Sequence, residues 1–424
     1  MDAPLRCPGE VRYGDPVCHL CGLGVHKDRV TACLRRLGSD GHVTQELRSF
    51  GTTTGELLTL LDWLGAAGCT HVAMESTGGS WKPVFNILEG HFQQVLVVNA
   101  QNSTALPGRK KDTLDAEWIA QLLQHGLLRG SFIPPAPIRD LREATCARKQ
   151  LIRLRADEAN RIQKLLERAN RTLGSVATDI LGVSGRAMLA ALVHGETNPT
   201  VLARLAKGRL RKKQPQLVAA LTGQILPVQR TLLGQQLAHG AYLDRAIAEL
   251  DALIATLLAP YQAEAERLRS IPGIDTRGTE TLIAELGADM AVFPSDGHCA
   301  SWAAMCPGHN ESAGKRRSGK TRKGSQGLRA ALREAAWAVS RTRTSLGAQY
   351  HRFARRRGKK KAAVAVGHSI LVIAYHLLKE GTTYRELGHD YFDTRDTARL
   401  QQRLIARLGA LGLRVTVEPA LQPA

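Results

Sequence analysis

The sequence predicts an α/β domain at the front of the chain and a mostly helical body behind it. Three β-type segments, at 17–25, 29–35 and 41–50, are rich in valine, leucine and threonine and are separated by short stretches with glycine. From about residue 141 onward, the apolar residues recur mainly at helical spacings. The 424 residues suffice for two or three domains, each with a core of its own.

The rest of the front domain alternates helices and strands. A helix is expected at 54–67, where four leucines share one face, and after it come strand 70–75, a turn at 76–79, helix 81–88, strand 95–98 and helix 113–125. Three consecutive strands with short connections predict an antiparallel meander, and the later strand–helix–strand units predict parallel additions to the same sheet. This is the ribonuclease-H-like order, which many nucleases and transposases share and which alone establishes no activity.

Two long helices are expected behind the prolines at 134 and 135. The first covers 141–173, and the second follows Pro227, where apolar residues at alternating spacings of four and three form a heptad seam of Leu243, Ile247, Leu250, Ile254, Leu257 and Tyr261. The pair is either a hairpin that packs on itself or an oligomerisation arm, and its length and polar outer faces favour the arm. The basic run at 207–213 between them either tracks phosphates or is simply solvated.

The last part of the chain is predicted to be helical as well. The Ile-Pro-Gly-Ile sequence at 271–274 fits half of a phosphate-binding helix-hairpin-helix and a plain helix–helix turn equally well. Helices are expected at 279–286, 328–342 and 362–378. The first two flank a polar loop at 307–326, and a loop of that length is usually either functional or disordered. After about residue 391, a helical pattern at 397–408 and a proline-bearing end have no evident role.

The charge of the chain points to a polyanionic partner. Lysine and arginine number 58 against 38 acids, which gives a net charge of +20 on a chain of ordinary hydrophobic content. Nucleic acid is the expected partner, with an acidic membrane surface as the second choice. We expect no membrane span and no signal peptide, and therefore a cytoplasmic, nucleoid-associated bacterial protein.

The eight cysteines are best interpreted as reduced thiols, several of them buried. Cys18-x-x-Cys21 is the one tight pair, and no second pair or histidine pair follows it at zinc-finger spacing. Structural zinc is therefore the weaker alternative, and a disulfide framework does not suit a large cytosolic chain.

Three acids in the front domain form a candidate metal site. Glu75 ends a strand, and Asp112 and Asp115 begin a helix, three apart and so on one face. In a ribonuclease-H-like sheet these positions converge, and Mg²⁺ would relieve the repulsion and serve phosphodiester chemistry. Alternatively, Asp112 could simply cap the helix and Asp115 could interact favourably with the helix dipole, but this alternative leaves Glu75 unexplained. Lys110 and Lys111 beside them would hold a nucleic-acid backbone.

A serine in the polar loop is the candidate nucleophile. Ser312 lies in Asn-Glu-Ser-Ala-Gly at 310–314, and six of the next nine residues are basic: Lys315, Arg316, Arg317, Lys320, Arg322 and Lys323. Attack on a phosphate would form a phosphoserine ester, which preserves the bond energy for rejoining but needs a base or a metal. On spacing alone, a solvated loop serine is the plainer interpretation. A further basic cluster at 352–361 would grip phosphates, and the low aromatic content of 4% disfavours base stacking.

At these residues the chain resembles the insertion-sequence-110 transposases, also called DEDD transposases and related to the Piv DNA invertase. The resemblance runs from about 17 to about 388. It rests on Gly-Leu-Gly-Val-His-Lys at 22–27, Met-Glu-Ser-Thr-Gly at 74–78, Pro-Gly-Arg-Lys-Lys-Asp-Thr-Leu-Asp-Ala at 107–116, Ser-Phe-Ile-Pro-Pro at 131–135, Ile-Pro-Gly-Ile at 271–274 and Glu-Ser-Ala-Gly-Lys at 311–315. So many segments in the same order make the match specific.

The resemblance implies an organisation and a mechanism. It implies a RuvC-like domain at 17–140, a helical coiled-coil region at 141–265, a C-terminal transposase domain of the insertion-sequence-116/110/902 type at 266–390 and a tail at 391–424. It also implies a Mg²⁺-dependent DNA recombinase that forms homo-oligomers, dimers or tetramers, and uses a structured guide RNA from its own element. Glu75, Asp112 and Asp115 match the last three acids of the family's tetrad, and Ser312 matches its nucleophile.

One position departs from the family pattern. The first acid of the tetrad belongs between Leu23 and Val25, where this chain has Gly24. His26, two residues on, would share its face but is a poor ligand for Mg²⁺, and Asp28 lies further along. We therefore expect impaired metal binding and reduced or absent catalysis. Three hypotheses follow: a recombinase weakened by Gly24, a non-catalytic nucleic-acid-binding homologue, and a metal-dependent nuclease that has no use for Ser312.

Overall fold

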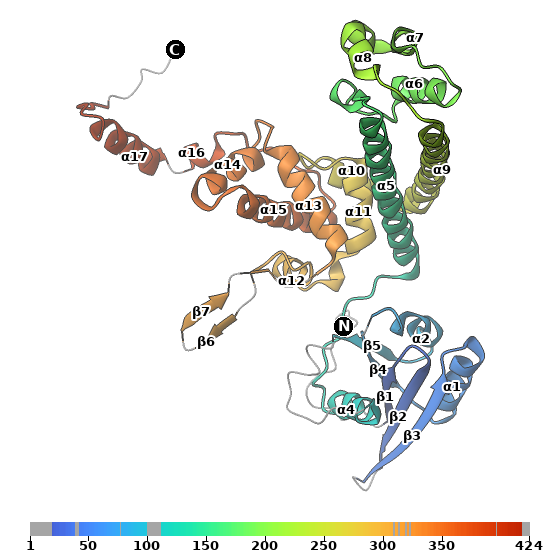
Figure 1. Ribbon diagram of the computed structural model, residues 1–424. Coiled ribbons are helices and arrows are strands. Elements are labelled where there is room, and N and C mark those ends of the chain that lie inside the picture. Colours follow the sequence, from blue (N-terminus) through green and yellow to red (C-terminus); the bar gives the residue numbers. More distant parts are fainter. Residues whose placement is uncertain are drawn as a thin grey trace. The chain divides into compact units, whose positions relative to one another are not determined.

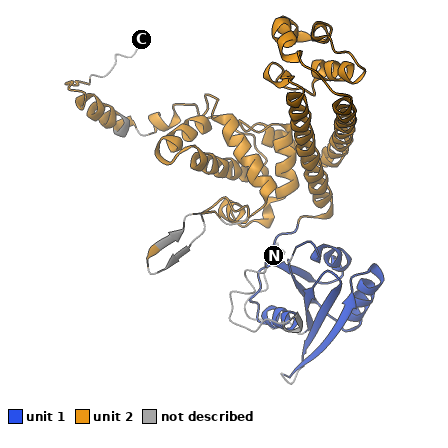
Figure 2. Ribbon diagram, viewed as in Figure 1, with its two compact units in different colours: residues 1–133 blue, residues 134–424 orange. Residues whose placement is uncertain are grey.

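The computed structural model describes residues 19–38, 42–76, 78–99, 112–307, 310–312, 314–318, 320–321, 324–395 and 397–417. The chain divides into two compact units (Figure 2), which we call the front unit, Met1–Ile133, and the back unit, Pro134–Ala424. Each is described by itself. A mixed α/β front unit followed by a largely helical back unit confirms the predicted fold class in outline.

The front unit is built on one five-stranded sheet. Its strand order is β3-β2-β1-β4-β5, with β1 (His19–Val25), β2 (Arg29–Leu37), β3 (Val43–Gly51), β4 (His71–Glu75) and β5 (Gln94–Val98). The first three strands pair antiparallel, whereas β4 pairs parallel to β1 and β5 parallel to β4. The predicted meander with two parallel additions is confirmed, with strand ends shifted by one or two residues.

Helices cover both faces of this sheet (Figure 1). Side chains alternate along each strand, so that Leu23 and Met74 join the core under α1 (Thr54–Ala66) and α2 (Trp81–Leu88), while Leu20 and Ala73 join the core under α4 (Asp112–Gln124). The result is a three-layered domain, consistent with a ribonuclease-H-like fold.

The packing of α4 on the sheet depends on a glycine. A Cβ atom at Gly22 would lie 2.3 Å from the carbonyl oxygen of Ala116 and 2.4 Å from the amide nitrogen of Ala120. Both alanines are fully buried. The helix backbone therefore rests directly on β1, which fixes where its first turn lies relative to the strand ends.

The back unit begins with a helical arm. Helices α5 (Ala136–Arg168) and α9 (Pro227–Leu258) lie side by side, and α6 (Val183–Val193), α7 (Pro199–Arg204) and α8 (Gln214–Leu221) form a small core at the tip (Figure 1). Helix α5 starts right after Pro135 and ends before Asn170, which has a φ of 54°. The first predicted helix is thus displaced by about one turn toward the N-terminus.

Most residues of the predicted heptad seam pack against other parts of the same chain. Leu243, Ile247 and Ile254 are buried within the back unit, while Leu250 and Leu257 are half-buried. This is what a helical hairpin that packs on itself requires. A coiled coil between copies of the chain remains a prediction.

The body of the back unit is a helical cluster around α15 (Lys359–Glu380). This helix contacts α10 (Gln262–Arg269), α12 (Asp296–Trp302), α13 (Gln326–Val339) and α14 (Ser345–Arg357), and α11 (Thr276–Leu286) packs on α13 and α5. Helix α15 is long and apolar enough to cross a membrane by length and composition alone, but 56% of its most apolar window is buried in this cluster. It is the core helix of the body.

Several elements of the back unit were not predicted, among them the tip helices α6, α7 and α8 and the body helix α12. Helix α14 occupies residues assigned to no element, and the predicted polar loop contains a small hairpin of β6 (Asn310–Ser312) and β7 (Lys315–Ser318). After α15 the chain continues into α16 (Tyr391–Thr394) and α17 (Thr397–Gly409), the latter close to the predicted tail helix.

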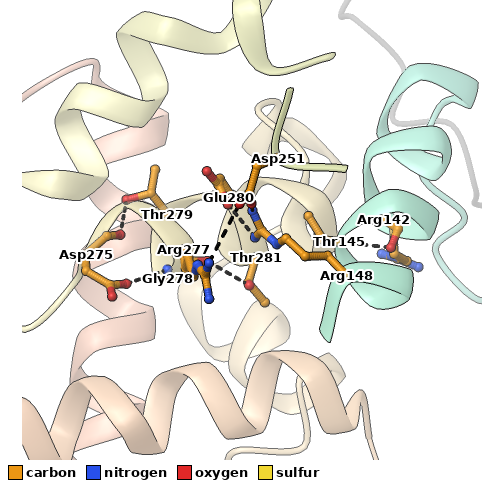
Figure 3. Close-up of polar contacts among 10 residues, drawn as sticks. All are labelled: Arg142, Thr145, Arg148, Asp251, Asp275, Arg277, Gly278, Thr279, Glu280 and Thr281. Carbon is orange, nitrogen blue, oxygen red and sulfur yellow. Dashed lines mark hydrogen bonds and ion pairs between the residues drawn. The ribbon is translucent and has the colours of Figure 1, made fainter. Parts of the chain in front are cut away.

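A buried ion-pair network joins the arm to the body (Figure 3). Arg148 of α5 is 4% exposed and donates to Asp251 of α9 at 2.7 Å and to Glu280 of α11 at 2.5 Å. Arg142, also on α5, donates to the carbonyl oxygens of Ala284 and Glu285 at 3.0 and 2.8 Å. Because a buried charge is costly unless it is paired, these contacts fix α5 against both neighbours.

Candidate active site and nucleic-acid interface

Gly24 and Glu75 are neighbours on adjacent strands. Leu23 of β1 pairs with Met74 of β4 in parallel register, so the next residue on each strand, Gly24 and Glu75, also lie side by side. Strand alternation turns both positions toward the α4 face, the face of Gly22 and Ala73. Glu75 is half-buried there. The tetrad position that Gly24 occupies is therefore adjacent to the glutamate.

The first turn of α4 points to the same end of the sheet. Arg35 pairs with Leu20 at the beginning of β1 and donates from Nε to Gln124, the last residue of α4, at 3.0 Å. The helix therefore runs antiparallel to β1, and its first residues lie toward Gly24. Asp112 is the first residue of α4, and Asp115 is half-buried one position before Ala116, which packs on the sheet.

The structure thus brings the backbone of positions 24, 75, 112 and 115 to one end of the front unit. The side chain of Asp112 lies outside the described residues, and so do Lys110 and Lys111. Within the described part of the chain, no three His, Cys, Asp or Glu side chains are gathered as a metal ion would require. The acids as metal ligands stay a prediction.

The residues that might stand in for the missing carboxylate are poorly placed. Strand β1 ends at Val25, and the amide of His26 donates to the carbonyl oxygen of Arg29 at 2.9 Å, so His26 and Asp28 belong to an exposed turn. Thr31, which the sequence did not single out, lies across from Gly24 on β2 and is 3% exposed. Its hydroxyl is a neutral oxygen and cannot supply a carboxylate's charge.

The candidate nucleophile ends the first strand of the small hairpin. Ser312 pairs with Lys315, and Gly314 in the turn between them has a φ of 70°, a conformation that glycine adopts without strain. Lys315 and Lys320 are exposed. The side chains of Ser312, Arg316 and Arg317, and all of Arg322 and Lys323, lie outside the described residues, so their roles remain predictions.

The Ile-Pro-Gly-Ile turn is better explained as packing. A Cβ at Gly273 would lie 2.6 Å from Cγ1 of Val339 and 2.7 Å from the carbonyl oxygen of Ala335, so the turn rests on α13. Asp275 caps α11 by accepting from the amide of Gly278 at 2.7 Å. A carboxylate at this N-terminus repels phosphate, which favours the plain turn over a phosphate-binding motif.

The other basic segments are exposed. The cluster at 352–361 spans the end of α14, Gly358 and the first turn of α15, and the run at 207–213 largely coincides with a 3₁₀ helix, Gly208–Lys213, at the tip of the arm. Both are accessible to a polyanion.

The buried cysteines of the front unit are reduced thiols with little tendency to ionise. Cys21, Cys33 and Cys69 are buried in the front unit, and burial raises the pKa of Cys33 and Cys69 to about 12 and that of Cys21 well above its usual value. Zinc binding requires thiolates. Cys18 lies outside the described residues, and the burial of Cys21 favours the thiol interpretation.

Two family models match this chain. A transposase model of the DEDD, IS110 type covers residues 21–171, which include Gly24, Glu75, Asp112 and Asp115. The model described as "Transposase IS116/IS110/IS902 family" covers residues 265–352, which include Ser312. The chain belongs to the IS110 family of transposases. Membership makes DNA the partner of this transposase, and transposition, a form of DNA recombination, its class of reaction. Among curated proteins, none matches the chain.

Proposed function

We propose that this IS110-family transposase cuts and rejoins DNA with Glu75, Asp112 and Asp115 as magnesium ligands and Ser312 as nucleophile, and that Gly24 weakens the reaction. The proposal is carried by the convergence of two neighbouring strand ends and the start of α4 at one end of the sheet. It is supported by the DEDD model's match to residues 21–171, a range that contains Glu75, Asp112 and Asp115.

The donor chemistry suits a hard divalent ion. Glu75 and Asp115 are half-buried, where carboxylates repel each other more than in water, and carboxylate oxygen is the ligand that Mg²⁺ prefers. A bound ion would neutralise this repulsion and polarise a phosphodiester. Three carboxylates can hold such an ion, but less tightly than four, because Gly24 contributes no oxygen.

The serine would conserve the energy of the broken bond. Its hydroxyl oxygen attacks phosphorus, a phosphoserine ester forms, and a sugar hydroxyl leaves. The hydroxyl of a second strand then reverses the step and releases the serine. Lys315, opposite Ser312 in the hairpin and exposed, would help to hold the phosphate. The protein needs no ATP for this exchange.

The partners we propose are a guide RNA from the same element and further copies of the chain. The net charge of +20 suits a second polyanion beside DNA. Exposed apolar side chains along the arm, among them Leu154, Leu232, Tyr242 and Leu253, favour contacts between copies. The arm would then serve both as a hairpin and as an interface.

The decisive experiment restores the missing acid. The native chain and Gly24→Asp are compared in recombination of the element's own ends, with the element's RNA and Mg²⁺ supplied. The strand conformation of Gly24 is one that any residue adopts, so the backbone itself does not oppose the change. We expect Gly24→Asp to recombine at least tenfold faster, an amount typical for a metal ligand or its immediate support.

Two outcomes would redirect the proposal. If neither chain recombines DNA while both bind it, the non-catalytic homologue, which the glycine at position 24 favours, replaces the recombinase. Adding Ser312→Ala to Gly24→Asp should abolish rejoining. If cleavage persists in that double variant, the chain is a metal-dependent nuclease and Ser312 is no nucleophile.

A further inference from the structure

We infer that the back unit has a DNA-binding site beyond the residues proposed for cutting: a basic pocket between α14 and the C-terminal extension after α15 that holds a phosphodiester backbone. The inference rests on the proposed function, because it presumes that the chain handles DNA. The pocket measures about 770 Å³ and is lined by His351, Arg352, Arg355, Arg356, His389, Phe392, Asp393 and Arg403, with Ala348 and Gln402. Seven of its ten lining residues lie beyond residue 352, where the second family match ends.

The charges in this pocket are not balanced. Arg352, Arg355, Arg356 and Arg403 face a single acid among the lining residues, Asp393. Four guanidinium groups around one hollow repel each other, and they stay charged at any relevant pH. Such a cluster lowers the stability of the free protein and becomes favourable once an anion enters.

Contacts join the two sides of the pocket. Nη1 of Arg352 donates to Oδ1 of Asp393 at 3.4 Å, and its guanidinium carbon lies 5.1 Å from the ring centre of Phe392. Nε2 of His351 lies 2.9 Å from the carbonyl oxygen of Ser340. Residues from α14 and α16 therefore meet in this pocket.

Residues of the C-terminal extension close the pocket on the side opposite α14. Helix α14 alone presents its arginines on a convex surface, whereas the pocket is closed from the other side by His389, Phe392 and Arg403. A concave site with cations on two sides matches a backbone phosphate and its neighbouring sugar. Its volume exceeds that of a free phosphate ion, which favours a segment of nucleic acid.

The experiment compares arginines inside and outside the pocket. The full chain and the variants Arg355→Ala, Arg403→Ala and Arg407→Ala are titrated against a fluorescein-labelled DNA duplex from about 50 to 200 mM salt. Arg407 is the matched control, because it lies on α17 like Arg403 and is exposed but does not line the pocket.

We expect each pocket variant to weaken binding roughly three- to tenfold and to reduce the slope of log affinity against log salt by about one. For Arg407→Ala, the change in affinity and the change in salt slope should each be less than half of those amounts. If all three variants behave alike, the cations act as a diffuse charge and the pocket is no site. If the native chain fails to bind DNA at all, both the pocket and the proposed function fail.

A change of opposite sign tests the same pocket. Asp393→Asn removes its acid, so DNA should bind more tightly and with a steeper salt slope, even though Arg352 loses its partner. Weaker binding would mean that Asp393 only supports the fold and would count against the site. The same titrations with a single-stranded RNA of identical sequence separate the ligands: variants that lose RNA while keeping DNA would overturn the assignment to DNA.

Discussion

The two units of this transposase bury different kinds of side chain. Among the described residues, the polar side chain buried in the front unit is Thr31, and its core is otherwise apolar with thiols. The back unit buries five charged side chains: Arg148, Glu158, Arg171, Glu280 and Glu285. Both units have apolar cores, to which the front unit adds a close approach of backbones at Gly22 and the back unit adds ion pairs between helices.

The difference follows from what each unit has to align. A sheet and a helix pack through flat surfaces, so small residues such as Gly22 and Ala116 set their separation. Helices in an arm can slide and rotate past one another. An arginine that is bonded to acids on two other helices favours a single register among the three helices. Arg148 provides such a register between α5, α9 and α11.

Gly22→Val should unfold the front unit. The new side chain would overlap the backbone of α4, which cannot move away like a flexible side chain, so we expect a loss of more than about 4 kcal/mol although valine favours strands. Hydrogen exchange of the full chain should show lost protection in residues 19–124 and normal protection in the back unit. The control, Gly65→Ala on α1, meets open space and should stabilise the unit by about 0.5–1 kcal/mol.

Arg148→Ala should destabilise the back unit by about 3–5 kcal/mol, because Glu280 would be left buried without its partner. Denaturant unfolding should show the loss, and hydrogen exchange should locate it in α5 and α11. Arg153→Ala, an exposed arginine on the same helix, should cost less than about 0.5 kcal/mol. Equal effects of the two would mean that the network contributes no specific stability.

Alkaline pH should weaken the front unit before the back unit. Burial raises the pKa of Cys33, Cys69 and, in the back unit, Cys299 to about 12, and raises that of Cys21 as well. Unfolded thiols ionise near pH 9, so above that pH the unfolded state binds fewer protons and stability falls as pH rises, by up to about 1 kcal/mol per thiol and pH unit. Pulse proteolysis at about pH 8 and pH 10 should show the front unit cut first, and Cys33→Ala should reduce the difference.

Asp275→Ala should have the smallest effect, a loss of about 1 kcal/mol from the cap of α11. Asp275→Asn keeps an acceptor for the amide of Gly278, so its loss of stability should be only a few tenths of that for Asp275→Ala. Thermal melts of the full chain would measure both. A tenfold gain in DNA affinity for the alanine variant would revive the phosphate-binding interpretation of this turn.

Much of the front unit could be predicted from the sequence because hydrophobic alternation and glycine punctuation agree there. All five strands and three helices of the sheet domain were expected close to where they lie. Helix α14 was missed because it combines Gly347 with a run of arginines, although Thr344 marks its start by accepting from the amide of Gly347. The β6–β7 hairpin was missed because Ala-Gly is a weaker turn signal than Asn-Gly.

The candidate site could be predicted only in part. The positions of Glu75, Asp112 and Asp115 at one end of the sheet follow from topology, which the sequence indicates. The neighbourhood of Gly24 and Thr31 depends on the register between β1 and β2, which hydrophobicity alone does not specify. The basic pocket arises where Arg352 meets Asp393, residues too far apart in sequence for any local pattern to join.

The joint at Arg148 lies well below the tip of the arm. With 33 residues, α5 is about 50 Å long, and about 30 Å of it extends past Arg148. A turn of about 10° at this joint would swing the tip sideways by about 5 Å. A small change of angle at the Arg148 ion pair would therefore produce a much larger displacement at the tip, and would alter whatever contacts the tip makes.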